Sequence, residues 1–210
     1  MKRTNLMILG RSNLVFSLYQ NYRLLIFCFT FILGLLIGSL VVKNSDSTVN
    51  NLISETFNTY ISNRTGQTFF KTFFYSFTSL LPYLIAAYFL GVSIVGVFFV
   101  PFVVLIRGLG IGLISGFLYS VHSLKGIAFT VLLIAPYCLV STFGLILACR
   151  ESFGFSLMLL KAASSKSSSV NLHDDYKLYC IRYLVIVVIF IFSAFLDSVM
   201  SLAFMRFFNF

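Results

Sequence analysis

Long stretches of this chain carry no charged side chain, and their lengths match the thickness of a membrane. Residues 24–42 are uncharged and strongly apolar, and Arg23 and Lys43 flank them. About 20 apolar residues form a helix that crosses the roughly 30 Å hydrocarbon core of a bilayer. Hydrophobic residues make up 59% of the chain and charged residues 10%, whereas soluble domains contain about 45–50% and about 25%. The sequence therefore predicts an integral membrane protein.

The other uncharged stretches predict four further helices. Residues 73–106 are too long for a single crossing, and Gly91 and Gly96 interrupt them where a turn is needed. We expect two spans joined by a tight turn, with a re-entrant hairpin as the alternative. The predicted fold is an all-α bundle of five transmembrane helices within one membrane domain covering residues 1–210. The spans are 24–42, 73–91, 96–120, 127–149 and 183–205, with a short loop before the fourth.

Basic residues predict the orientation of this bundle. Cytoplasmic loops of membrane proteins are enriched in lysine and arginine. If the N terminus is inside, more of these residues lie on the cytoplasmic side than outside. Residues 1–23 are then a basic cytoplasmic segment on the membrane surface, 43–72 an extracytoplasmic loop and 150–182 a cytoplasmic loop. The C terminus is expected outside. The net charge of +9 does not indicate nucleic-acid binding, because the basic residues form no continuous patch with aromatic residues between them.

Five glycines recur at the spacing of one helix face. Gly108, Gly112 and Gly116 lie four residues apart in the third span, and Gly34 and Gly38 repeat the spacing in the first. Small residues at this spacing allow two helix backbones to approach closely in a membrane. We predict helix packing within one bundle, with an interface between subunits of a homo-oligomer as the alternative.

Arg107 places a charge near the middle of the third span. Such a charge costs from about 2.5 to more than 10 kcal/mol unless it finds a partner or water. Asp197 is the acidic residue within a predicted span, so an Arg107–Asp197 ion pair joining the third and fifth spans is predicted. In the alternative, Arg107 anchors the helix at the membrane surface. A small transporter or channel subunit using this region is the second functional hypothesis, because prolines break several spans.

Catalysis has little support in the sequence. There is no HExxH motif, and His122 and His173 lie on opposite predicted faces, so they cannot share a metal ion. The four cysteines show no CxxC or Cys/His spacing. We expect no catalytic residue, no metal site and no cofactor, and the chain is not expected to be an enzyme.

Residues 89–129, "FLGVSIVGVFFVPFVVLIRGLGIGLISGFLYSVHSLKGIAF", resemble the stage II sporulation protein M family. Members contain L-G-x-S-I-x-G, then a basic residue with G-x-x-x-G-F, then a loop ending in K-G. The matching residues here are Gly91, Ser93, Ile94, Gly96, Arg107, Gly108, Gly112, Gly116, Phe117, Lys125 and Gly126. A wider set of related membrane proteins carries L-P-H-G-x-x-E in span four, where this chain has "APYCLVS" with Tyr137 at the histidine position.

The resemblance implies five spans and a membrane scaffold in endospore formation. It also implies two partners at the septal or engulfing membrane of the mother cell, a cell-wall amidase/endopeptidase and a lytic transglycosylase. These enzymes work outside the bacterial cytoplasmic membrane, so we expect the 43–72 loop to contribute to their binding. Its apolar residues follow helical spacing and can dock on a partner, lie on lipid or pack on the bundle. The nominated partner-binding residues are Leu52, Ile53, Phe57 and Tyr60.

Overall fold

The computed structural model describes residues 22–44, 52–56, 59, 68–164 and 172–204. Within these ranges the chain is helical and contains no β-strand. The helices are α2 (Tyr22–Lys43), α4 (Phe69–Val92), α5 (Gly96–Phe129), α6 (Ala135–Ser164) and α7 (Leu172–Phe204), with the π-helical turn η1 (Thr130–Ile134) between α5 and α6. Five of the helical stretches described are long and apolar enough to cross a membrane. This confirms the predicted all-helical class with five spanning helices.

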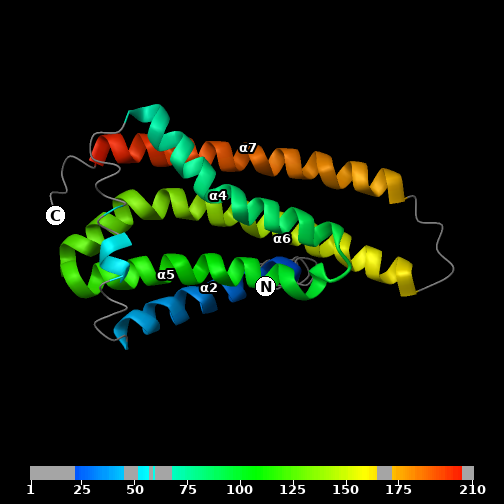
Figure 1. Cartoon of the computed structure of the whole chain (residues 1–210), viewed down its shortest axis with the longest axis horizontal. Coiled ribbons are helices and arrows are strands. Elements are labelled where there is room, and N and C mark those ends of the chain that lie inside the picture. The colour runs from blue at the N-terminus through cyan, green and yellow to red at the C-terminus, as the bar shows by residue number, and fades with distance from the viewer. Residues whose placement is uncertain (1–21, 45–51, 57–58, 60–67, 165–171, 205–210) are drawn as a thin grey trace, which may run out of the picture.

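The long helices lie side by side and alternate in direction (Figure 1). We call one end of the bundle the arginine end: it contains the start of α2, the α4–α5 turn, the end of α6 and the start of α7. The opposite end contains the end of α2, the start of α4, η1 and the end of α7. The prediction that residues 73–106 form two helices joined by a tight turn agrees with α4 and α5, which the short turn at Ser93–Val95 separates.

The bundle has two packing regions. Helix α2 contacts α5 far more than any other helix, whereas α4, α6 and α7 contact one another, and α5 also packs on α6 and α4. The larger buried cluster includes Phe27, Leu80, Val104, Leu145 and Phe190. Large apolar side chains such as Phe89, Phe98 and Leu139 are exposed on the outside of the bundle. An apolar exterior is what a helix bundle needs in order to lie in lipid.

Two segments that were predicted to be loops are largely helical in the structure. The short loop expected between residues 120 and 127 is part of α5, and the chain reverses near the end of this helix, before η1 (Figure 1). Pro136 follows η1 and lacks an N–H group, which favours a wider turn just before it. The predicted loop 150–182 is helical up to Ser164 and again from Leu172. Charged residues end a membrane span but do not end a helix, so helices α6 and α7 continue past Arg150 and Arg182.

Candidate functional site

The five predicted glycines lie at the interface between α2 and α5. A Cβ atom added at Gly34 would lie 2.5 Å from the Leu105 carbonyl oxygen, and one at Gly108 would lie 2.5 Å from that of Phe31. Gly38 and Gly112 face the opposing backbone in the same way, and Gly116 faces Ser39. The opposing atoms are backbone atoms, which cannot rotate away as a flexible side chain can. These glycines therefore allow direct contact between two helix backbones within one chain.

Gly110 lies between these glycines in sequence but on a different face of α5. A Cβ atom there would have nothing within 4 Å, apart from its own helix and chain neighbours. The requirement for glycine is therefore specific to the face that carries Gly108, Gly112 and Gly116. Gly110 provides an internal control for any substitution on that face.

Arg107 lies between α5, α4 and α6. Its Nη2 atom donates hydrogen bonds of 3.4 Å to the Tyr137 hydroxyl and of 3.4 Å to the Ser141 hydroxyl, both on α6. Its guanidinium also lies 5.2 Å from the centre of the Tyr83 ring of α4 and 5.9 Å from that of Tyr137. Hydroxyl groups and ring faces stabilise an arginine charge that has little access to water. The contacts connect three helices through one side chain.

Asp197 has different immediate partners from those predicted. It is buried, with 2% of its surface exposed, and accepts a hydrogen bond from the Ser76 hydroxyl of α4. One turn earlier on α7, the Ser193 hydroxyl donates to the Tyr137 carbonyl at 3.0 Å. These partners of Arg107 are thus on α6 and α4, and this partner of Asp197 is on α4, instead of the direct Arg107–Asp197 ion pair that was predicted. Helices α5 and α7 are coupled through Tyr137, on which both Arg107 and Ser193 converge.

A cluster of hydroxyl groups at the interface of α4, α6 and α7 was missed by the sequence analysis. The Ser152 hydroxyl lies 3.2 Å from the Tyr179 hydroxyl and 2.5 Å from the Tyr183 hydroxyl. The Tyr179 hydroxyl donates to the Tyr88 carbonyl at 3.0 Å, and the Tyr88 and Tyr176 hydroxyls are 2.8 Å apart. Tyr176, Tyr179 and Tyr183 recur at i, i+3 and i+7, so helical spacing was the signal that could have revealed them.

Small residues make room for this cluster. Gly91 of α4 lies against Ser152, since a Cβ atom added there would come within 2.9 Å of the Ser152 Cα atom. One turn further along α6, the Ser156 hydroxyl donates to the Ser93 carbonyl at 2.6 Å. The end of α4 and the α4–α5 turn are thus fixed to α6. Gly91 and Ser93 belong to the L-G-x-S-I-x-G motif, and both residues contact α6 in this structure.

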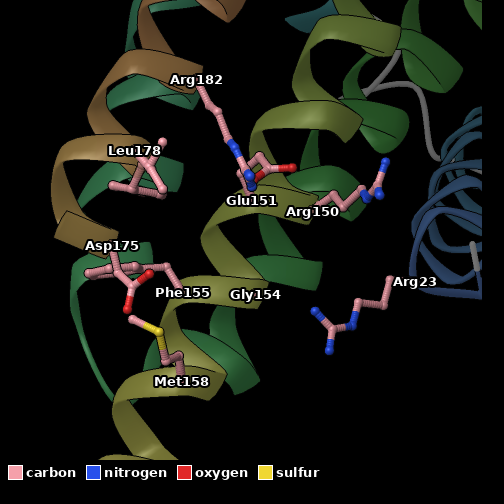
Figure 2. A pocket seen from close by; sticks show the side chains of 10 residues that line it. Arg23, Arg150, Glu151, Gly154, Phe155, Met158, Asp175, Leu178 and Arg182 are labelled. Atoms are coloured by element: carbon pink, nitrogen blue, oxygen red, sulfur yellow. The ribbon is translucent and has the colours of Figure 1, made fainter. Parts of the chain in front are cut away.

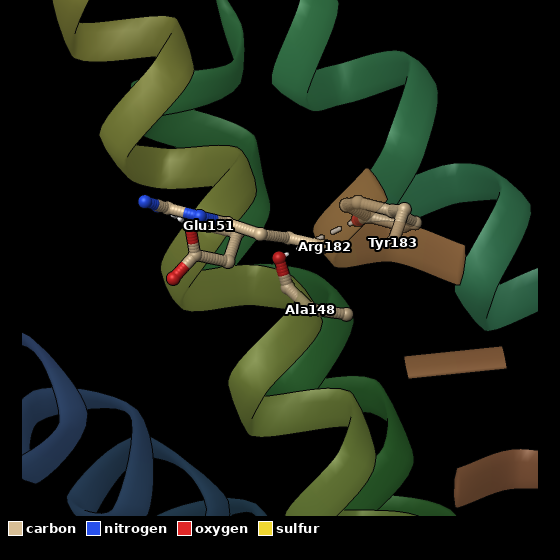
Figure 3. Close-up of polar contacts among 4 residues, drawn as sticks. All are labelled: Ala148, Glu151, Arg182 and Tyr183. Carbon is tan, nitrogen blue, oxygen red and sulfur yellow. Dashed lines mark hydrogen bonds and ion pairs between the residues drawn. The ribbon is translucent and has the colours of Figure 1, made fainter. Parts of the chain in front are cut away.

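A polar pocket lies next to the cluster at the arginine end (Figure 2). Its volume is about 280 Å³, and α2, α6 and α7 line it. Its charged residues are Arg23, Arg150, Glu151, Asp175 and Arg182. Figure 3 shows how α6 and α7 are joined beside it: Arg182 pairs with Glu151 at 2.6 Å, and the Tyr183 hydroxyl donates to the Ala148 carbonyl at 3.4 Å.

The nominated residues of the 43–72 loop are only partly within the described ranges. Residues 52–56 are helical, as predicted. Leu52 is 61% exposed, whereas Ile53 packs on a buried cluster that includes Val42, Phe117 and Leu118. Phe57 and Tyr60 lie outside the described residues, as does the predicted surface segment before Tyr22. Ile53 therefore packs on the bundle of its own chain, and Leu52 is the nominated residue that the structure shows exposed.

Together these features define an all-helical integral membrane protein whose intramembrane polar groups bind one helix to another. Within the described residues, no group of three His, Cys, Asp or Glu side chains is placed to hold a metal ion. The family model described as Stage II sporulation protein M matches residues 25–201. The match covers most of the chain, which therefore belongs to this family. Comparisons with curated proteins and with solved structures gave no significant match.

Proposed function

We propose that this chain is a membrane scaffold in endospore formation that recruits and anchors peptidoglycan-degrading enzymes at the septal and engulfing membrane. Membership of the Stage II sporulation protein M family suggests a role in sporulation. The partners in this proposal are a cell-wall amidase/endopeptidase and a lytic transglycosylase. The chain itself cleaves no bond and requires no cofactor.

The environment of Arg107 is the observation that carries the proposal. A transport path needs polar groups that a solute can reach near the middle of the membrane. The Arg107 guanidinium instead contacts Tyr83, Tyr137 and Ser141 of neighbouring helices. These contacts support a role in fixing α5 against α4 and α6, which is a role in architecture. A rigid bundle is what a scaffold needs if it is to present binding surfaces in fixed positions.

The proposed orientation places the arginine end in the cytoplasm. Arg23, Arg150, Lys161, Lys177 and Arg182 all belong to helix segments at that end. Basic residues are enriched on the cytoplasmic side of membrane helices, which supports this assignment. The opposite end then faces the cell wall, where the partner enzymes act. Its described surface includes the exposed Leu52 and the reversal around η1.

Affinity purification of the full, tagged chain from membranes of sporulating cells tests the proposal. We expect the two wall enzymes to co-purify, and deletion of the gene to arrest cells after the asymmetric septum forms. Leu52→Ala should reduce the captured enzyme without changing the amount of the chain, whereas Leu139→Ala, an exposed position on the side of α6, should leave capture unchanged. Failure of the wild-type chain to capture either enzyme would contradict the proposal.

The same preparation distinguishes the transporter hypothesis. If the chain were a transporter, purified protein in liposomes would move a solute, and Arg107→Gln would abolish that movement. On the scaffold proposal, liposomes containing the wild-type chain and those containing the variant have the same permeability.

A further inference from the structure

The pocket at the arginine end contains arginines from three helices. Arg23 comes from the start of α2, Arg150 from α6 and Arg182 from α7. Figure 2 shows the Arg23 side chain reaching towards α6 near Gly154. A Cβ atom at Gly154 would lie 3.4 Å from the Arg23 Nη1 atom, so the guanidinium lies close to the backbone of α6. The convergence is produced by folding, because these arginines are far apart in the sequence.

The charges of this pocket are only partly compensated. Arg182 pairs with Glu151 at 2.6 Å. Asp175 lies beside Phe155 and Met158 in Figure 2, away from Arg23. Arg23 donates to the Tyr22 hydroxyl at 3.3 Å and lies 5.8 Å from the centre of the Phe153 ring. Within the part of the chain that the structure describes, neither Arg23 nor Arg150 forms an ion pair with a carboxylate. Two arginines are therefore available to an anion.

The pocket lies at the level where the apolar part of the bundle ends. Uncharged stretches begin directly after Arg23 in α2 and Arg182 in α7, and another ends directly before Arg150 in α6. The α4–α5 turn provides a second marker of this level, because Ser93 at that turn accepts a hydrogen bond from Ser156 of α6. In a bilayer, lipid phosphates lie just beyond the hydrocarbon region. The three arginines are thus positioned at the depth of the headgroups of one leaflet.

We propose that this pocket binds the phosphate headgroup of an anionic phospholipid. Arg23 and Arg150 are its phosphate ligands, because planar guanidinium groups donate paired hydrogen bonds to phosphate oxygens. Arg182 and Glu151 form the side of the pocket, and Phe155, Met158 and Leu178 complete its lining. Basic pockets between membrane helices on the cytoplasmic side favour such lipids. The bound lipid would hold α2 against the α6–α7 pair.

Thermal unfolding of the purified full chain in detergent micelles tests this proposal. Three separate samples contain cardiolipin, phosphatidylglycerol or phosphatidylcholine, each at the same concentration. A ligand that binds the folded state raises the melting temperature, and the rise grows with the logarithm of the ratio of ligand concentration to dissociation constant. We expect cardiolipin and phosphatidylglycerol to raise it above the value in phosphatidylcholine. For Arg23→Gln/Arg150→Gln, the apparent affinity for the anionic lipids should fall by about tenfold or more.

Two further variants keep the test independent of a general change in charge or folding. Lys43→Gln/Lys71→Gln removes the same number of charges from the opposite end and should retain the full response. Arg23→Lys/Arg150→Lys keeps the charge but loses the planar donors, so it should respond with intermediate affinity even if the glutamine variant fails to fold. Equal stabilisation by phosphatidylcholine, or an unchanged response in the lysine variant, would overturn the proposal. Equal stabilisation by inorganic phosphate without anionic lipid would reject the lipid and assign the site to free phosphate.

Discussion

The α2–α5 interface and the α4–α6–α7 interface hold this bundle together in different ways. At α2–α5, glycines face backbone atoms, and no side chain could fit between the helices at Gly34 or Gly108. At α4–α6–α7, serine and tyrosine hydroxyls bond across the interface, with Ser152 at the centre. The first interface depends on shape and the second on hydrogen bonds. In lipid there is little hydrophobic drive between helices, so these are the two main sources of stability that a helix pair can use.

The difference implies different sensitivities to substitution. A side chain added at the glycine interface must push two helix backbones apart, which weakens contacts along the whole α2–α5 interface. A hydroxyl removed from the polar interface leaves the packing intact and removes one or two bonds. Arg107 connects the two regions, because it is on α5 and its partners Tyr83 and Tyr137 are on α4 and α6.

Gly112→Leu should have the largest effect. The new side chain would collide with the Leu35 backbone of α2, and overpacking of this kind costs about 3 kcal/mol when the surroundings cannot move. We expect a large loss of folded protein, measured as the monodisperse fraction of a fluorescent fusion after heating. Gly110→Leu is the matched control and should behave as wild type, because its position is open. Equal loss in both variants would show that helix propensity, not the α2–α5 contact, is responsible.

Ser152→Ala should have the next largest effect. It removes a fully buried hydroxyl that lies within hydrogen-bond distance of both Tyr179 and Tyr183. We expect a loss of about 1.5 kcal/mol, near the upper end for interhelical hydrogen bonds in membranes. The free energy of unfolding in mixed micelles measures it. Ser115→Ala is the control, since within the described residues the Ser115 hydroxyl donates to carbonyls of its own helix, those of Ile111 and Gly112. An equal loss of unfolding free energy in Ser115→Ala would show that the hydrogen bonds between helices do not add stability beyond those within a helix.

Tyr137→Phe should cost about 1 kcal/mol, because it removes one long hydrogen bond to Arg107 and keeps the ring. A double-mutant cycle with Arg107→Met isolates the contact. In the Arg107→Met background, the tyrosine substitution should have almost no effect on the free energy of unfolding. Additive costs in the two backgrounds would show that Tyr137 does not stabilise the arginine.

Glu151→Gln should have the smallest effect. Its partner Arg182 is 60% exposed, and exposed ion pairs contribute about 0.5 kcal/mol. The change in the free energy of unfolding should decrease further in high salt, because screening weakens exposed pairs. A loss comparable to that of Ser152→Ala would mean that the pair is shielded from solvent in the membrane.

Sequence spacing was sufficient for the features that depend on backbone shape. Glycines four residues apart identified the faces of α2 and α5 that meet, since this spacing places them on one side of a helix, whereas Gly110 falls on another side. Uncharged stretches located five helices but not their ends, because α6 and α7 continue as helices beyond Arg150 and Arg182. The segment near His122 looked like a loop because it is short and polar, yet a helix can continue through such residues.

Polar partners were not predictable in the same way. Tyr137 counts as apolar in a hydropathy pattern, so the group that contacts Arg107 was not considered and the more strongly charged Asp197 was chosen instead. The clustering of Arg23, Arg150 and Arg182 depends on which helices are neighbours, and hydropathy does not determine that. A signal was nevertheless present, since each of these arginines adjoins an uncharged stretch at a boundary that the topology brings to the same end of the bundle.

Disulfide cross-linking in membranes tests the α2–α5 contact most directly. After replacement of the four native cysteines, Ser39→Cys and Gly116→Cys are combined. A Cβ atom at Gly116 would lie 3.5 Å from the Ser39 Cβ atom, within the range that a disulfide spans. We expect rapid intramolecular cross-linking on mild oxidation, with capture of wall enzymes retained in the cross-linked bundle. Cross-linking no faster than in the Ser39→Cys/Gly110→Cys pair would contradict it.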